Sequence, residues 1–338
     1  MPLNVNSEET TKNSLMDNPQ HVSATSEYAV FKNALDSRNY PALKKVRKAD
    51  LHAHAFLSAG LEVYRELSPD MPEPPGRFNG FAEFCSWLDK YCVPVTLASY
   101  EKVISAAFSR LVEDGVVYAE VSFDYHDALS MRLSIDEWCR LIQSLQMPFS
   151  GRLKLCPEFG ISREEDPAIS LRHFGEAVKT GLFRSIDLYG DEFSRPVGGF
   201  KHIYQIAAEA KMKRKAHLGE FGTAADVKEG VEILGLNAVQ HGIAAANDPE
   251  VMAFLRERGI TLNICPSSNL ALGRCRSLAE HPIRRLFDHK VRVTLNSDDF
   301  MLFRAGVTEE IVSLYNIGLF CAEELRQIVQ SGLAESTS

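Results

Sequence analysis

Short apolar runs typical of β-strands alternate with amphipathic, helix-like stretches through most of this 338-residue chain. The runs predicted to be strands are 48–55, 116–123, 152–159, 183–190, 213–220, 237–243, 260–267 and 291–299. The stretches predicted to be helices include 98–113, 135–145, 168–179, 200–210, 224–234 and 249–258. A strand–helix–strand repeat places its strands parallel in one sheet. Eight such units predict an α/β fold, a closed (β/α)8 TIM barrel. An open doubly wound sheet is the alternative, and no glycine-rich phosphate loop follows the first run to support its dinucleotide-binding form.

Two segments fall outside this repeat. Residues 57–115 separate the first two predicted strands and are predicted to hold three helices, one of them within "FAEFCSWLDKYC" at 81–92. A long insertion after the first strand covers one end of the barrel, so we expect a helical lid or pocket wall. Residues 1–25 are polar and are predicted to be a disordered tail. Residues 26–338 are predicted to be a single catalytic barrel domain.

Charge, cysteine usage and the lack of long apolar runs argue against a nucleic-acid partner, a membrane span and secretion. The formal net charge is -8 and the pI is about 5.7, which disfavours broad binding to a nucleic-acid backbone. The seven cysteines are scattered without a C-x-x-C pair, as expected for reduced thiols. No apolar run is long enough to cross a bilayer, and the N-terminus lacks the pattern of a secretory signal. We therefore expect a cytoplasmic protein with neither a nucleic-acid nor a membrane partner; the oligomeric state stays open.

Ionisable side chains stand at the ends of several predicted strands, at the edge of a parallel barrel where active sites lie. These positions are His52 and His54 in "DLHAH", Asp191 and Glu192 after Gly190, His217 and Glu220 in "HLGE", His241 in "QHG", and Asp298 and Asp299 in "NSDD". Burying so many titratable groups is costly unless they pair or bind a metal. Residues two apart in a strand share a face, so both histidines of "DLHAH" point at one spot. His52, His54, His217 and Asp298 form a nitrogen-rich set that suits one Zn²⁺ or another divalent transition metal.

Two further side chains are predicted to move protons. Zinc lowers the pKa of a bound water to about 7, and His241 is expected to take the proton from that water. Glu220 follows His217 after a glycine, and a glutamate kept protonated in a dry pocket can pass its proton to a substrate. The other histidines lack such placement and are predicted to lie on the surface or in loops: His21, His126, His173, His202, His281 and His289.

Six motifs in order resemble those of the adenosine deaminase family, in the amidohydrolase superfamily. They are "DLHAHAF", "DLYGDE", "AHLGEFG", "VQHGI", "LNICPSSN" and "TLNSDD", and the resemblance spans roughly residues 45–330. It implies a TIM barrel with one catalytic zinc that deaminates a purine nucleoside or base at C6, giving the 6-oxo purine and ammonia. The metal ligands would be His52, His54, His217 and Asp298, the last also serving catalysis. Glu220 would protonate the ring nitrogen N1, and His241 would assist the attacking hydroxide. Asp299 would bind near N7, and the N–H of Gly190 would contact N3.

One position departs from the pattern of this family. Typical members follow the paired histidines with a leucine, then an aspartate or asparagine that helps to hold the ribose 5′-hydroxyl. Here that position is Phe56, which cannot accept a hydrogen bond. We therefore count Phe56 among the substrate-binding residues. We expect a substrate whose 5′ group is apolar or absent, such as a 5′-thio nucleoside, or else an N6-substituted adenine.

Other functions remain open on the sequence alone. Another metal hydrolase reaction, such as amide or lactone hydrolysis, is compatible with the fold. A catalytically silent binding relative is a second alternative, although every proposed metal and proton-transfer residue is present. A deaminase of nucleoside monophosphates is a third, with Arg163 or Arg195 as the candidate phosphate contacts.

Overall fold

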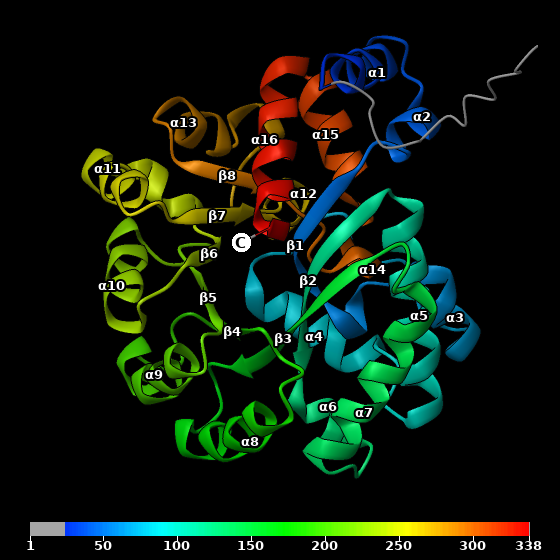
Figure 1. Cartoon of the computed structure of the whole chain (residues 1–338), viewed down its shortest axis with the longest axis vertical. Coiled ribbons are helices and arrows are strands. Elements are labelled where there is room, and N and C mark those ends of the chain that lie inside the picture. The colour runs from blue at the N-terminus through cyan, green and yellow to red at the C-terminus, as the bar shows by residue number, and fades with distance from the viewer. Residues whose placement is uncertain (1–23, 338) are drawn as a thin grey trace, which may run out of the picture.

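The computed structural model describes residues 24–337, whose strands form one parallel barrel (Figure 1). Eight strands follow one another around it in chain order. They are β1 (Lys48–His54), β2 (Val116–Asp124), β3 (Lys154–Ser162), β4 (Ser185–Tyr189), β5 (Lys213–Leu218), β6 (Ala238–His241), β7 (Thr261–Ile264) and β8 (Arg292–Leu295). Beyond β8 the chain returns to β1, where Ala53 and Asp298 form a parallel bridge and the N–H of Asp298 donates to the carbonyl of His52 at 2.9 Å. The predicted TIM barrel is confirmed.

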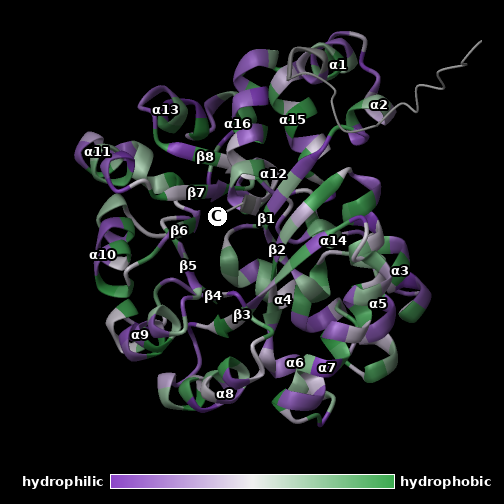
Figure 2. Ribbon diagram, viewed as in Figure 1, coloured by the Kyte–Doolittle hydropathy of each residue, from purple (hydrophilic) through white to green (hydrophobic). Residues whose placement is uncertain are grey.

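Helices surround the strands on the outside of the barrel (Figure 1). Those that follow β2 to β8 are α6 (Tyr125–Ser130), α7 (Ile135–Gln146), α8 (Pro167–Thr180), α9 (Lys201–Glu209), α10 (Ala224–Leu234), α11 (Pro249–Glu257), α12 (Pro266–Ala271), α13 (Ile283–Asp288), α14 (Phe300–Phe303), α15 (Val307–Asn316) and α16 (Ala322–Ala334). Hydrophilic and hydrophobic residues alternate along these helices (Figure 2), as expected for helices that bury one face against the sheet. The predicted strand 260–267 ends early because Pro266, which cannot donate a backbone hydrogen bond, begins α12.

The segment between β1 and β2 is helical, as predicted. It holds a short 3-10 turn, η1 (Ala55–Leu57), and then α3 (Leu61–Leu67), α4 (Phe81–Tyr91) and α5 (Leu97–Glu113). α5 packs along η1 and β2 and buries one face, whereas Phe81, Phe84 and Cys85 of α4 line the main pocket. That placement is the one expected of a pocket wall; its role as a lid stays a prediction.

The N-terminal helices α1 (Ala24–Asp36) and α2 (Tyr40–Lys44) lie beside α15 and α16, where Glu27 of α1 accepts a hydrogen bond from Arg326 at 2.8 Å. The predicted tail, residues 1–25, lies outside the described residues except for its last two, which begin α1. His21 lies outside them as well.

A lysine is buried inside the barrel, below the strand ends that carry the candidate site. The Nζ of Lys215 lies 2.6 Å from Oε2 of Glu120 and also pairs with Glu158, and it donates to the carbonyl of Leu51 at 2.9 Å. Neither the lysine nor the two glutamates are exposed by more than 1 %. Buried charges of this kind are tolerated when they are paired, so the three residues tie β2, β3 and β5 together across the barrel.

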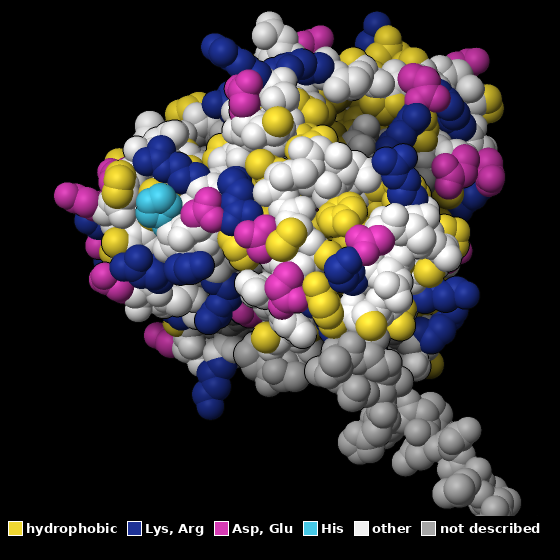
Figure 3. Space-filling model, turned by 90° about the horizontal axis from the view of Figure 1, so that it is seen from above, with side chains coloured by type: hydrophobic (Ala, Val, Ile, Leu, Met, Phe, Trp, Pro, Cys, Tyr) yellow, Lys and Arg dark blue, Asp and Glu magenta, His cyan; other side chains and the backbone are white. Residues whose placement is uncertain are grey.

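The outer surface mixes charges of both signs. On the face shown in Figure 3, lysine and arginine side chains are interspersed with aspartate and glutamate. Among the described residues, no helix combines the length and the apolar character that a membrane span requires.

Candidate active site

Four histidines predicted to belong to the site meet at the C-terminal ends of the strands. The ring of His52 lies 5.1 Å from that of His54, 4.7 Å from that of His217 and 5.0 Å from that of His241, measured between centroids. His52 and His54 come from β1, where residues two apart point the same way. His217 is the last residue but one of β5, and His241 is the last residue of β6. The parallel barrel therefore brings together residues that are as much as 189 positions apart, from 52 to 241.

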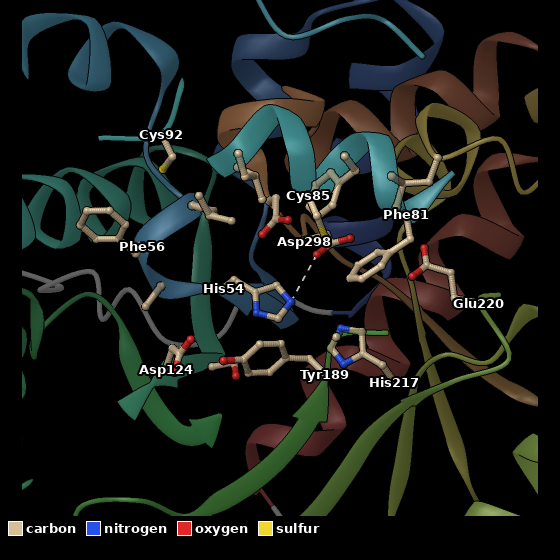
Figure 4. A pocket seen from close by; sticks show the side chains of 18 of the residues that line it. His54, Phe56, Phe81, Cys85, Cys92, Asp124, Tyr189, His217, Glu220 and Asp298 are labelled. Carbon is tan, nitrogen blue, oxygen red and sulfur yellow. Dashed lines mark ion pairs between the residues drawn. The ribbon is translucent and has the colours of Figure 1, made fainter. Parts of the chain in front are cut away.

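Asp298 lies against this cluster from the turn that follows β8. Its Oδ1 is 3.4 Å from Nε2 of His52 and 3.6 Å from Nε2 of His54, and its Oδ2 is 3.8 Å from Nε2 of His241. Figure 4 shows the contact between His54 and Asp298, with His217 beside them. Although burial opposes ionisation, the nearby His52 holds the pKa of Asp298 well below its usual range. A carboxylate with histidine nitrogens on one side is a typical arrangement for binding a divalent cation.

The donor atoms fit a metal ion. His52, His54, His217 and Asp187 each place one donor atom within 4.8 Å of the donor atoms of the other three. Asp298 belongs to two further groups of this kind, one with His52 and one with His54. His52 is fully buried, and neither of its ring nitrogens makes a hydrogen bond within the described residues. Unsatisfied buried nitrogens of this kind are costly unless something binds them.

Asp187, in the middle of β4, is a site residue that the sequence did not reveal. Its Oδ1 lies 3.3 Å from Nδ1 of His217. The charge of this carboxylate outweighs the effect of burial and raises the pKa of His217 to about 9. A carboxylate on one ring nitrogen of a histidine fixes the ring so that its other nitrogen faces a metal. We therefore interpret Asp187 as the residue that orients His217 rather than as a ligand.

The loop after β5 places Glu220 beside the cluster. Gly219 there has φ 67°, and a Cβ at that position would lie 2.3 Å from Cγ2 of Val227, so only glycine fits. Glu192 accepts hydrogen bonds from the N–H groups of residues 219, 220, 221 and 222 at 2.7, 2.8, 2.7 and 3.3 Å. Burial, and next the charge of Asp298, raises the pKa of Glu220 to about 8. The glutamate is thus held protonated at neutral pH, as a proton donor must be.

A chain of hydrogen bonds connects Glu220 and His241 to residues behind them. Asn269 of α12 donates through Nδ2 to Oε1 of Glu220 at 2.9 Å and to Nδ1 of His241 at 3.1 Å. The Nδ1 of His281 accepts a hydrogen bond from the N–H of Ile283 at 3.1 Å. The ring proton therefore sits on Nε2, which donates to Oδ1 of Asn269 at 3.3 Å. This bond fixes which way the amide of Asn269 points. His241 accepts at Nδ1 and therefore carries its own proton on Nε2.

His281 lies in a loop, as predicted, but it is buried. It stands between η5 (Leu278–Glu280) and α13 and is only 2 % exposed. Burial lowers its pKa to about 3, so the ring is neutral and its two nitrogens take fixed roles. The spacing of apolar residues gave no signal for this, because His281 lies between α12 and α13 rather than at the end of a strand.

Two of the predicted site residues have a left-handed backbone. His241 has φ 59° and Asp298 has φ 55°, although neither is glycine. Such conformations are uncommon for residues with a Cβ and cost about 1–3 kcal/mol each, and they cluster at functional sites. His241 is the last residue of β6 and Asp298 lies in the turn three residues after the end of β8, and at both places this backbone turns the side chain toward the shared cluster.

A pocket of about 340 Å³ opens in front of these residues. All the predicted substrate-binding residues, Phe56, Gly190 and Asp299, line it, together with His54, His217, Glu220, His241 and Asp298. Phe56 is 9 % exposed and stacks on Tyr100 with a centroid distance of 6.0 Å. Burial, and next the charges of Asp298 and Glu220, raises the pKa of Asp299 well above its usual range. Of the predicted site residues, His52 alone lies behind the pocket wall.

Apart from its histidines, the ionisable groups that line this pocket are carboxyl groups, cysteine thiols and one tyrosine. Besides the residues already named it includes Asp124, Asp127 and Glu164, and none of the described residues that line it is a lysine or an arginine. The candidate phosphate contacts are engaged elsewhere: Nε of Arg163 donates to the carbonyl of Arg195 at 2.6 Å, and Nε of Arg195 donates to the carbonyl of Glu164 at 3.3 Å.

Comparison with known proteins agrees with this geometry. The sequence model described as adenosine deaminase matches residues 69–337. The chain belongs to the adenosine deaminase family. The predicted family and the predicted class of enzyme, an aminohydrolase, are thereby confirmed. The match begins after β1, which carries the paired histidines, and after η1, which carries Phe56.

Related sequences and solved structures include several deaminases. A putative adenosine/adenine deaminase of Treponema pallidum is 32 % identical over 275 residues, covering 80 % of this chain and 92 % of the relative. An adenine deaminase of Streptomyces coelicolor is 27 % identical over 327 residues, covering 88 % and 92 %. The crystal structure of an adenine deaminase from Arthrobacter aurescens superposes with a TM-score of 0.77 at 22 % identity, covering 86 % of this chain and 94 % of that one. At this identity the superposition supports the barrel fold alone.

Proposed function

We propose that this adenosine deaminase family member is a metal-dependent hydrolase that deaminates C6 of an adenine-type purine lacking a phosphate. Water adds its oxygen to C6, the bond from C6 to the amino nitrogen breaks, and ammonia leaves the 6-oxo purine. The observation that carries this proposal is the meeting of four histidines, Asp298 and a protonated Glu220 at the inner end of one pocket. The names of the related sequences, adenosine and adenine deaminases, support the substrate class.

In this proposal His52, His54, His217 and Asp298 hold one divalent ion, with zinc preferred because nitrogen donors dominate the set. When bound, such an ion activates a water molecule as a nucleophile. The protein's own side chains do the rest. Glu220 gives its proton to the ring nitrogen N1, which removes the cost of placing negative charge on the ring.

The remaining predicted residues position the substrate and the water. His241 carries its proton on Nε2 and accepts at Nδ1 from Asn269, so we assign it the task of orienting the water by donating a hydrogen bond, in place of the proton uptake predicted from the sequence. Asp299, with its raised pKa, retains a proton that it can donate to N7. The N–H of Gly190, at the end of β4, is assigned to N3. Together these contacts hold C6 toward the histidines, which converts the attack into a step between positioned partners.

The pocket lining supports the exclusion of nucleotides. A phosphate group would face Asp124 and Glu164, with no described lysine or arginine in the lining to neutralise it. Like charges at this range are repulsive, and more so where little water screens them. Phe56, Phe84 and Leu88 line an apolar part of the same pocket, which fits a 5′ group without a hydroxyl.

The experiment that tests this proposal is ammonia release from a panel of adenosine, adenine, 5′-methylthioadenosine and AMP, run with metal analysis of the purified protein. We expect turnover of the first three, the highest kcat/KM for 5′-methylthioadenosine, and none for AMP. Phe56→Asn should shift preference toward adenosine, while Phe81→Leu, near Glu220 on the other side of the pocket (Figure 4), should not change it. Release of ammonia from AMP at a comparable rate would contradict the exclusion of phosphate. No release from any purine would contradict the proposed reaction.

A further inference from the structure

One end of the pocket has buried polar atoms that the proposed chemistry does not use. Ser122 and Asp127 line the pocket and are 2 % and 7 % exposed. The Oγ of Ser122 and the Oδ2 of Asp127 make no hydrogen bond within the described residues. Buried polar atoms are almost always satisfied in folded proteins, so two such atoms facing one cavity indicate that a ligand completes them.

The backbone places these atoms together with a third polar group. Ser122 and Asp124 are two residues apart near the end of β2 and so share one face of the sheet. Asp124 caps α6, its Oδ1 accepting from the N–H of His126 at 2.8 Å, and Asp127 follows in the first turn of that helix. In Figure 4, Asp124 and Phe56 lie on the opposite side of His54 from Glu220. A purine with N1 at Glu220 would therefore extend its N9 substituent toward this end.

The chemistry of this end suits hydroxyl groups. A hydroxyl both donates and accepts, as do the side chain of Ser122 and a protonated carboxyl. Burial, and next the charge of Asp124, raises the pKa of Asp127 well above its usual range, so the carboxyl is neutral rather than a counter-ion for a cation. Carboxyl side chains hold the hydroxyls of ribose in dinucleotide-binding folds by the same kind of contact.

We infer that Ser122, Asp124 and Asp127 form a subsite for the sugar hydroxyls of a purine nucleoside, so that this enzyme selects nucleosides over free adenine. The inference rests on the proposed function for the placement of the purine ring. It assigns the recognition of the sugar to the end of β2 and to α6, since the position after the paired histidines is Phe56.

Kinetics with matched substrates test the subsite. For wild type we expect kcat/KM to be about tenfold to a hundredfold higher for adenosine than for 2′,3′-dideoxyadenosine. In Asp127→Asn and Ser122→Ala we expect this ratio to fall toward one, through KM, with turnover of adenine unchanged. Glu164→Gln removes a carboxylate from the lining without touching the subsite, and it should affect all three substrates alike. Equal losses for adenosine and adenine in Asp127→Asn would show a structural role and overturn the inference.

Calorimetric binding of inosine and 2′,3′-dideoxyinosine separates this inference from the proposed reaction, because neither compound carries an amino group to lose. Tighter binding of inosine to wild type, lost in both Asp127→Asn and Ser122→Ala, supports the subsite even if no purine is deaminated. Equal affinity of wild type for the two compounds overturns the subsite even if deamination occurs. Circular dichroism and the thermal midpoint of each variant show whether it folds; if Asp127→Asn does not, Ser122→Ala alone decides.

Discussion

Glu192 controls the loop that carries Glu220, and replacing it with glutamine should damage catalysis more than folding. Each of its carboxylate oxygens accepts two backbone hydrogen bonds: Oε1 from residues 220 and 221, and Oε2 from residues 219 and 222. Glutamine keeps one oxygen and presents an NH₂ group in place of the other. Two of the four N–H groups would then face a donor, and the loop must move to relieve that contact.

The expected size of the effect follows from those contacts. A hydrogen bond to a charged group contributes about 1.5–3 kcal/mol, and a buried donor left unsatisfied costs about 1–3 kcal/mol. Losing two such bonds gives a gross loss of about 3–6 kcal/mol, of which relaxation of the loop recovers part, since Phe221 and Gly222 are partly exposed. We expect the free energy of unfolding to fall by about 2 kcal/mol. A displacement of Glu220 by about 1 Å lowers kcat by about a hundredfold.

Urea denaturation and steady-state kinetics of Glu192→Gln measure the two effects separately. Asp191→Asn is the matched control. Asp191 is the neighbouring residue, its Oδ1 accepts from the N–H of Phe193 at 3.0 Å, and among residues 24–337 no side-chain hydrogen bond joins it to the loop of Glu220. That variant should keep wild-type kcat within about twofold. A wild-type kcat in Glu192→Gln would show that the carboxylate of Glu192 does not position Glu220, which would contradict this prediction.

Three further variants test other parts of the structure. Lys215→Met removes the lysine that Glu120 and Glu158 share, which leaves Glu158 with only the hydroxyl of Ser185 and Glu120 with Lys213 and Tyr118. The free energy of unfolding in urea should fall by about 3–5 kcal/mol, and replacing both glutamates with glutamine in the same variant should recover most of it. Asn269→Asp removes the donor to the proton-transfer residues and should lower kcat by about tenfold to a hundredfold with little change in KM, as steady-state kinetics would show. Burial raises the pKa of Glu310 from 4.5 to about 8. A raised carboxyl pKa favours the protonated folded state. As pH rises between these two values, this residue therefore lowers the free energy of unfolding of wild type by up to about 1.4 kcal/mol per pH unit. Glu310→Gln should remove that decline in urea titrations at pH 5.5, 7 and 8.5, and an unchanged slope would contradict it.

The sequence predicted the barrel and the residues at its strand ends because both follow from simple periodicity. The rule that parallel strands end at one rim is enough to bring His52, His217 and Asp298 together. It gives no information on residues that act from behind the rim. Asn269 and His281 lie in and after a short helix, where neither the period of a strand nor that of a long helix applies. A signal for Asn269 was nevertheless present, since "PSSN" puts polar residues directly after the buried strand β7.

The two ends of the pocket differ in how far a sequence can specify them. The end that performs the chemistry uses side chains at fixed places on strands, so a small number of motifs defines it. The end assigned here to the sugar uses the end of β2 together with η1, α4 and α6, and the positions of these three helical elements depend on how each packs after its strand. Phe56 illustrates the difference: the sequence shows that it replaces a polar residue, whereas only the packed structure shows Ser122 and Asp127 facing the same cavity from β2 and α6. We therefore expect changes in the helical elements to alter which substrate this enzyme selects, while the residues at the strand ends determine the reaction.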